Sequence, residues 1–152
     1  MQRTANTGLQ YRSLEIARVN KTRVLIGEVV DQGNHEEGEF SNFVRSTMES
    51  AINSEENLEL VTAHEFALDK TNTGKAFFLS PKIHAPDYSG GKLFIKVEIV
   101  IFSYPGQTLR SVVALTVLQE DVGEPSDEVE YPLIRLALKN LMTKISVNID
   151  NF

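Results

Sequence analysis

Two alternating apolar segments, at residues 93–104 and 109–118, constrain the fold more than any other feature of the sequence. In the first segment the odd positions are all apolar, whereas the even positions mix apolar and charged side chains: Leu93, Ile95, Val97, Ile99 and Ile101, against Phe94, Lys96, Glu98, Val100, Phe102 and Tyr104. A period of two is typical of a β-strand with one buried face. Because Pro105 and Gly106 between the segments favour a turn, the sequence predicts a β-hairpin.

The hairpin also predicts its own register. The second segment again carries apolar residues at odd positions, among them Val113. Paired strands must place both apolar sets on one face, so opposed residues have numbers with an even sum, for example Ile99 opposite Val113. A two-residue loop of Pro105 and Gly106 would instead pair Tyr104 with Gln107. We therefore predict an odd-length loop or a β-bulge around Pro105–Gln107.

The residues before the hairpin predict a strand, a helix and a second strand. Residues 23–30 form a largely apolar run, which is typical of a strand buried on both faces. Residues 40–53 carry apolar side chains at helical spacing, and residues 58–62 predict another strand. This order indicates a βαβ unit with parallel strands.

Two further segments complete the predicted order of elements. Residues 81–91 hold two prolines and a Gly-Gly pair, and this composition predicts a loop. After an acidic linker at residues 120–130, residues 131–147 predict a terminal helix with a broad apolar face. Pro132 is expected in the first turn of that helix, where proline is tolerated.

These elements define one α/β (α+β) domain. A chain of 152 residues with 41% hydrophobic content is large enough for a single core. We expect a mixed sheet of four or five strands with two main helices, in the order strand, helix, strand, hairpin, helix. Residues 1–20 are polar with scattered apolar positions and are predicted to be a flexible or weakly ordered segment, which leaves residues 21–152 as the domain.

Composition narrows the function classes. The net charge is −6 and no two basic residues are adjacent, which argues against nucleic-acid binding. The absence of cysteine excludes disulfides, thiol catalysis and zinc–thiolate sites. No stretch approaches the roughly 18 apolar residues of a membrane span, and the polar start is not a signal peptide. A cytoplasmic chain fits this start, and so does one from which a signal or lipoprotein leader was removed.

The loop after the first strand is the candidate ligand-binding segment. It lies where open α/β sheets bind ligands, and its candidate residues for a cation or small molecule are Asp31, Asn34, His35 and Glu36. The EF-hand pattern fails, because Gly33 and His35 occupy positions that need oxygen ligands. A solvated loop leading into the helix is the simpler interpretation. We therefore predict no metal site and no cofactor.

No residue set for catalysis is visible. The sequence lacks nucleotide-binding glycine motifs, a serine elbow and an acid–base pair, so no catalytic residue and no enzyme activity are predicted. The even face of the hairpin is the candidate interaction surface, with Lys96, Glu98, Phe102 and Tyr104. Two other interpretations are open for this face: a hydrated surface with charge pairing, or burial of its apolar residues under the N-terminal segment.

Three stretches carry a resemblance to a known group of proteins. They are TRVLIGEVVD from residue 22, EFSNFVRSTMESAINSEENLELVTAHEF from residue 39, and the hairpin KLFIKVEIVIFSYPGQTLRSVVALTVLQ followed by YPLIRLALKNLMTKI. In hydrophobic pattern, over about residues 22–147, they resemble a group of bacterial envelope proteins. This group includes the curli secretion lipoprotein CsgG, the penicillin-binding-protein activator LpoB and the N-terminal domain of TolB.

The resemblance implies a non-enzymatic module that docks on protein partners or assembles into rings, and it transfers no functional residue. We expect a cell-envelope accessory or assembly protein that acts through protein–protein contacts, with a homo-oligomer as one form. We expect it in the periplasm or at the outer membrane, with membrane contact only through a removed lipid anchor. A cytoplasmic location, and cation or small-molecule binding by the loop after the first strand, are the alternatives.

Overall fold

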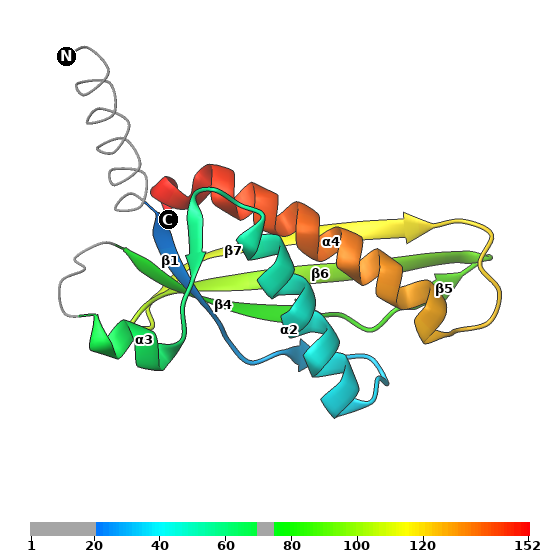
Figure 1. The fold of residues 1–152 in the computed structure, drawn as a ribbon. Coiled ribbons are helices and arrows are strands. Elements are labelled where there is room, and N and C mark those ends of the chain that lie inside the picture. Colours follow the sequence, from blue (N-terminus) through cyan, green and yellow to red (C-terminus); the bar gives the residue numbers. More distant parts are fainter. Residues whose placement is uncertain (1–20, 70–74) are drawn as a thin grey trace, which may run out of the picture.

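A computed structural model describes residues 21–69 and 75–152, and its fold is drawn in Figure 1. Within these residues the chain forms a mixed seven-stranded sheet, and its two long helices both lie on one face of that sheet. The predicted fold class is confirmed. The sheet exceeds the expected four or five strands because it includes two very short ones, β2 (Val30–Asp31) and β5 (Asp87–Ser89). The prediction for residues 1–20 lies outside the described residues.

The predicted βαβ unit is present. Strand β1 (Thr22–Ile26), helix α2 (Glu37–Asn53) and strand β3 (Leu58–Leu60) follow one another, and β1 and β3 are parallel. Strand β1 lies between β3 and β4 (Ala76–Ile83) and is buried along almost all of its length. The apolar run that begins at residue 23 is therefore buried on both faces, as its composition predicted.

The hairpin has the predicted register. It consists of β6 (Lys92–Ser103) and β7 (Leu109–Gln119), with Ile99 opposite Val113. The hairpin also contains the one-residue irregularity that the register argument requires. Ile101 lies opposite Ser111, whereas the next residue, Phe102, lies opposite Leu109.

The predicted position of this irregularity, around Pro105–Gln107, was wrong. The extra residue is Arg110 in β7 rather than a residue of the turn. The turn closes tightly: the Ser103 amide donates to the Thr108 carbonyl at 2.8 Å, and the Gln107 amide donates to the Ser103 carbonyl at 2.8 Å. The irregularity is accommodated in β7 instead, and sheet edges are where β-bulges are common.

The prediction of a loop at residues 81–91 was also wrong. Strand β4 continues through Pro81 to Ile83, and β5 follows within the same range. The carbonyls of Leu79 and Ile83 accept hydrogen bonds from the amides of Gly27 and Gln32. By alternation, the backbone of Pro81 faces the same side, between the end of β1 and the start of β2. Among the described residues, no strand pairs with β4 at this point, so the N–H that proline lacks is not needed.

The terminal helix α4 spans Asp127–Asn148, so it begins within the predicted linker. Its first turn holds Asp127, Glu128 and Glu130, and carboxylates there are stabilised by the positive end of the helix dipole. Pro132 consequently lies in the second turn rather than the first. A short helix, α3 (Ala63–Leu68), follows β3, and a 3-10 turn, η1 (Ile149–Asn151), ends the described chain.

The core lies between the sheet and the pair α2 and α4. The odd residues of β6 from Leu93 to Ile101 are fully buried there, together with the apolar faces of both helices; the largest buried side chains include Phe40, Met48, Ile52, Leu79, Ile95, Ile99, Ile134 and Leu138. We call this covered side of the sheet the inner face and the opposite side the outer face. None of the helices among the described residues has the length and apolar character to cross a membrane.

Candidate functional site

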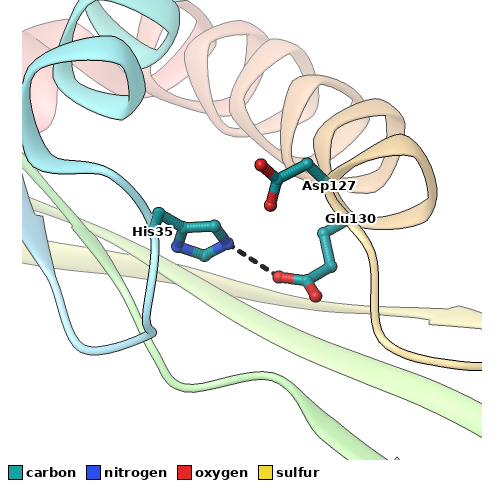
Figure 2. Close-up of side chains that lie close together, drawn as sticks. All are labelled: His35, Asp127 and Glu130. Carbon is teal, nitrogen blue, oxygen red and sulfur yellow. Dashed lines mark hydrogen bonds and ion pairs between the residues drawn. The ribbon is translucent and has the colours of Figure 1, made fainter.

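A buried cluster of polar side chains lies where the loop after β2 meets the start of α4 (Figure 2). The Nε2 atom of His35 is 2.7 Å from Oε1 of Glu130, and its Nδ1 atom is 3.0 Å from both carboxylate oxygens of Asp31. The other oxygen of Glu130 accepts a hydrogen bond from the Tyr88 hydroxyl at 2.6 Å. The cluster thus joins the loop, β5 and α4.

The loop sequence positions the imidazole. The Asp31 carboxylate also accepts a hydrogen bond from the Gly33 amide at 2.9 Å, which is a turn geometry favoured by aspartate. A Cβ atom at position 33 would lie 2.8 Å from Cε1 of His35, so only glycine leaves room for the ring. On its other side the ring stacks on Phe40, with 4.1 Å between centroids. The imidazole is therefore held at its two nitrogens by carboxyl groups and on one ring face by Phe40.

Both ring nitrogens of His35 face carboxylates, which requires both to carry protons. The side chains of His35 and Glu130 are only 3% and 7% exposed. Burial opposes the charged imidazolium, but the hydrogen bonds to Asp31 and Glu130 outweigh it, so the pKa of His35 is raised above its ordinary value. Burial, followed by the hydrogen bond to Glu130, raises the pKa of Tyr88 to about 12. The cluster therefore consists of one imidazole between two carboxyl side chains, with the Tyr88 hydroxyl as a further donor.

The cluster also borders an open cavity of about 350 Å³, lined by residues of the loop, β5 and the start of α4. One potential ligand atom from each of His35, Asp127 and Glu130 lies within 4.8 Å of the others, a spacing at which a metal ion could be held. A metal on Nε2 would have to displace both the proton and the contact with Glu130. As it stands, the arrangement pairs His35 with two carboxyl groups and connects the loop, β5 and α4.

The structure brings only some residues of the candidate ligand loop together. Asp31 and His35 come together, and Asn34 lines the adjoining cavity. Glu36 lies exposed at the N-cap position of α2 and takes no part in the cluster. Ligand binding by this loop stays a prediction.

Sequence reasoning missed Glu130, Tyr88 and Asp127. A signal existed for Glu130, because it precedes Ile134 and Ala137 on the buried stripe of α4 and so places a carboxylate among core positions. Its position within an acidic run made it resemble a solvated linker residue. Nothing in the local sequence marks Tyr88 as its partner.

The candidate interaction residues all lie on the outer face or at its end. Lys96 and His84 each approach Glu98 to 3.2 Å, which forms a charged group at the middle of β6. Burial opposes ionisation of Glu98, but hydrogen bonds from Lys96 and His84 hold the pKa of that carboxyl below its ordinary value. Further along the same strand, Phe102 is part of an aromatic group.

That aromatic group contains Phe78, Phe102, Tyr104 and Phe66. Tyr104 stacks on Phe78 with 6.3 Å between centroids and meets the edge of Phe66 from α3 at 4.9 Å. On the neighbouring strand β7, Val112 and Leu118 are 49% and 47% exposed, and they lie opposite the outer-face residues Val100 and Phe94. The outer face therefore carries accessible apolar side chains next to charged ones. Its role as an interaction surface stays a prediction.

Comparison with known proteins identifies the fold. No family model matches the chain, and neither does any curated protein sequence. Among solved structures, PelC from Paraburkholderia phytofirmans, a dodecamer, aligns with a TM-score of 0.54 at 7% identity over 82% of this chain and 88% of PelC.

Two other solved structures align equally well. The hypothetical protein CT253 from Chlamydia trachomatis has a TM-score of 0.53 at 12% identity, covering 87% of this chain and 98% of that one. Protein XCC0632 from Xanthomonas campestris also has a TM-score of 0.53, at 11% identity, covering 87% and 90%. The chain therefore has a fold found in bacterial proteins. The particular resemblance to CsgG, LpoB and TolB stays a prediction.

Proposed function

We propose that this protein is a non-enzymatic accessory or assembly protein of the bacterial cell envelope that binds other proteins through the outer face of its sheet. The observation that carries the proposal is the unequal covering of the sheet, since α2 and α4 both lie on the inner face. The outer face keeps half-exposed valine and leucine beside the group of Lys96 and Glu98. Exposed apolar surface of this kind, bordered by charge, is typical of protein–protein contact sites.

The envelope assignment is supported by the hydrophobic pattern, which resembles a group of envelope proteins. A homo-oligomer is supported by the fold, which is similar to that of PelC, whose solved structure is a dodecamer. By the same support, a homo-oligomer is one form of this protein, and its place is the periplasm or the outer membrane. A lipid anchor on a removed leader would supply the membrane contact.

The buried cluster supports a non-enzymatic protein. A general base must present a free nitrogen or oxygen to a substrate. Both nitrogens of His35 are occupied by Asp31 and Glu130, and Glu130 also accepts from Tyr88. We assign these side chains a supporting role, in which they fix the start of α4 against the loop and β5.

Cation binding at the same cluster is the second candidate function. One observation favours it, the approach of ligand atoms from His35, Asp127 and Glu130 to within 4.8 Å. A thermal-shift series with Zn²⁺ and Mn²⁺ decides, because a ligand bound only by the folded state raises the melting temperature. A rise that disappears in the Asp127→Asn variant would favour the cation site, and an unchanged melting temperature would favour the supporting role.

Chemical cross-linking in the native host, followed by affinity capture, tests the first proposal. The wild-type protein is compared with Phe102→Ser on the outer face and with Leu136→Ser, a half-exposed position on α4, as the matched control. We expect the wild type and the control to capture the same protein partner, and Phe102→Ser to lose it while remaining folded by circular dichroism. Equal capture by all three proteins would contradict a role for the outer face.

A further inference from the structure

Strand β7 forms a long edge of the sheet. On one side β6 pairs with β4 and β5, and on the other side it pairs with β7 along Leu93–Phe102. In the part of the chain that the structure describes, β6 is the strand partner of β7. The second side of an 11-residue strand is therefore left as an edge.

The backbone groups on this edge can be assigned by alternation. The Ser103 amide bonds the Thr108 carbonyl, and the Tyr104 amide bonds the Ala76 carbonyl, so odd residues of β6 face β7 and even residues face β4. Their odd partners in β7, such as Val113 opposite Ile99, use their amides and carbonyls on β6. The outward amides and carbonyls then belong to the even residues Val112, Ala114, Thr116 and Leu118, which are all exposed.

This edge lacks the usual protection against strand pairing. Natural edge strands are kept apart by charged residues, by proline, by bulges or by a short length. Ser111–Gln119 contains no charged residue, no proline and no glycine, although 24% of the whole chain is charged. The bulge lies at the beginning of β7, before this stretch. In a chain of net charge −6, the edge is a place where two copies can approach without opposing like charges.

We propose that two copies of this chain associate through antiparallel pairing of their β7 edges about a two-fold axis near Leu115. The outward N–H and C=O groups of the even residues then form hydrogen bonds with those of the second copy across the interface. With Leu115 opposite Leu115 of the second copy, Val112 lies opposite Leu118 and Ala114 opposite Thr116. Apolar β-branched and aliphatic side chains are thereby paired across the strands, which is favourable in sheets.

The helix beside the edge fits this arrangement. Helix α4 packs over β6 and β7, so the α4 helices of the two copies come to lie alongside one another on the inner faces. Leu136 of α4 is half exposed and borders a groove of about 500 Å³ with Leu133, Val122 and Gln119 at the end of β7. The two-fold interface would extend the sheet from one copy into the other. It would also bring apolar surface of the two α4 helices to the same side of the interface.

The proposal concerns the backbone edge of β7 and does not depend on a partner at the outer face. Thr116→Pro removes an outward N–H and leaves the bonds to β6 in place, whereas Thr116→Ala keeps the N–H and serves as its matched control. Light scattering after size exclusion should give twice the 17.0 kDa chain mass for the wild type and Thr116→Ala. Thr116→Pro should give the mass of one chain, with an unchanged circular dichroism spectrum.

Cysteine cross-linking gives a second readout that needs no disruptive variant. Because the chain has no cysteine, Ala114→Cys introduces a single thiol next to the proposed axis, and Val147→Cys introduces one at an exposed position on α4. A short bis-maleimide should link Ala114→Cys into dimers and leave Val147→Cys as single chains. A wild type that stays monomeric at high concentration, an assembly larger than a dimer, or an absence of cross-linking at position 114 would overturn the proposal.

Discussion

The two faces of β6 differ in how far they are buried. On the inner face Ile99 is fully buried under the helices, and its neighbours at odd positions are buried with it. On the outer face Lys96 is 48% exposed, and Val112 in the adjoining strand is 49% exposed. Adjacent residues therefore serve different purposes. The inner face determines that the chain folds, and the outer face is available for contact with other molecules.

The largest expected effect tests the inner face. Ile99→Ala removes a fully buried side chain and leaves a cavity, which costs about 2–5 kcal/mol of unfolding free energy. Val112→Ala, on the outer face of the next strand, should change the unfolding free energy by less than about 0.5 kcal/mol. Urea denaturation measures both variants. Similar losses from the two would mean that the outer face is also covered.

A second comparison concerns the buried cluster. Glu130→Gln should lower the unfolding free energy by about 1–3 kcal/mol, because it leaves the buried imidazolium of His35 with one carboxylate fewer. Asp127→Asn, on the exposed side of the same helix turn, should cost less than about 1 kcal/mol, the range of a helix-dipole contribution. Urea denaturation again distinguishes them. An equal cost for both would indicate that the cluster contributes only through the helix end.

The pH dependence of stability tests the charge state of His35. Its pKa in the folded protein is raised above the ordinary value of 6.5, so its stabilising contribution is complete below pH 6.5 and is lost as the pH rises through the raised pKa. The unfolding free energy should therefore fall on the alkaline side of pH 6.5. His35→Gln should flatten this decline, and His64→Gln, at an exposed site on α3, should retain it. A decline that persists in His35→Gln would assign it to another group.

For Glu98 on the outer face, the contribution to stability changes with pH in the opposite direction. Its pKa is lowered, so its contribution is present above the ordinary value of 4.5 and is lost as the pH falls through the lowered pKa. Acid titration of a Glu98→Gln variant against the wild type would separate this contribution from that of His35.

The sequence predicted what is local and periodic. Strand β1 follows from a continuous apolar run, helix α2 from helical spacing, and the pairing of Ile99 with Val113 from alternation. The continuation of β4 through Pro81 could not be foreseen, because it depends on a gap between two partner strands. The contact between His35 and Glu130 joins residues 95 positions apart, and no local pattern specifies such a pair.

The central claim is that the outer face contacts a protein other than a second copy of this chain, and that the exposed surface of α4 at Val147 does not. A photo-reactive phenylalanine analogue at Phe102, on the outer face, is compared in the native host with the same analogue at Val147, an exposed residue of α4. The account predicts a discrete adduct with another protein from position 102 and none from position 147. Adducts from position 147 alone, or from neither position, would contradict it.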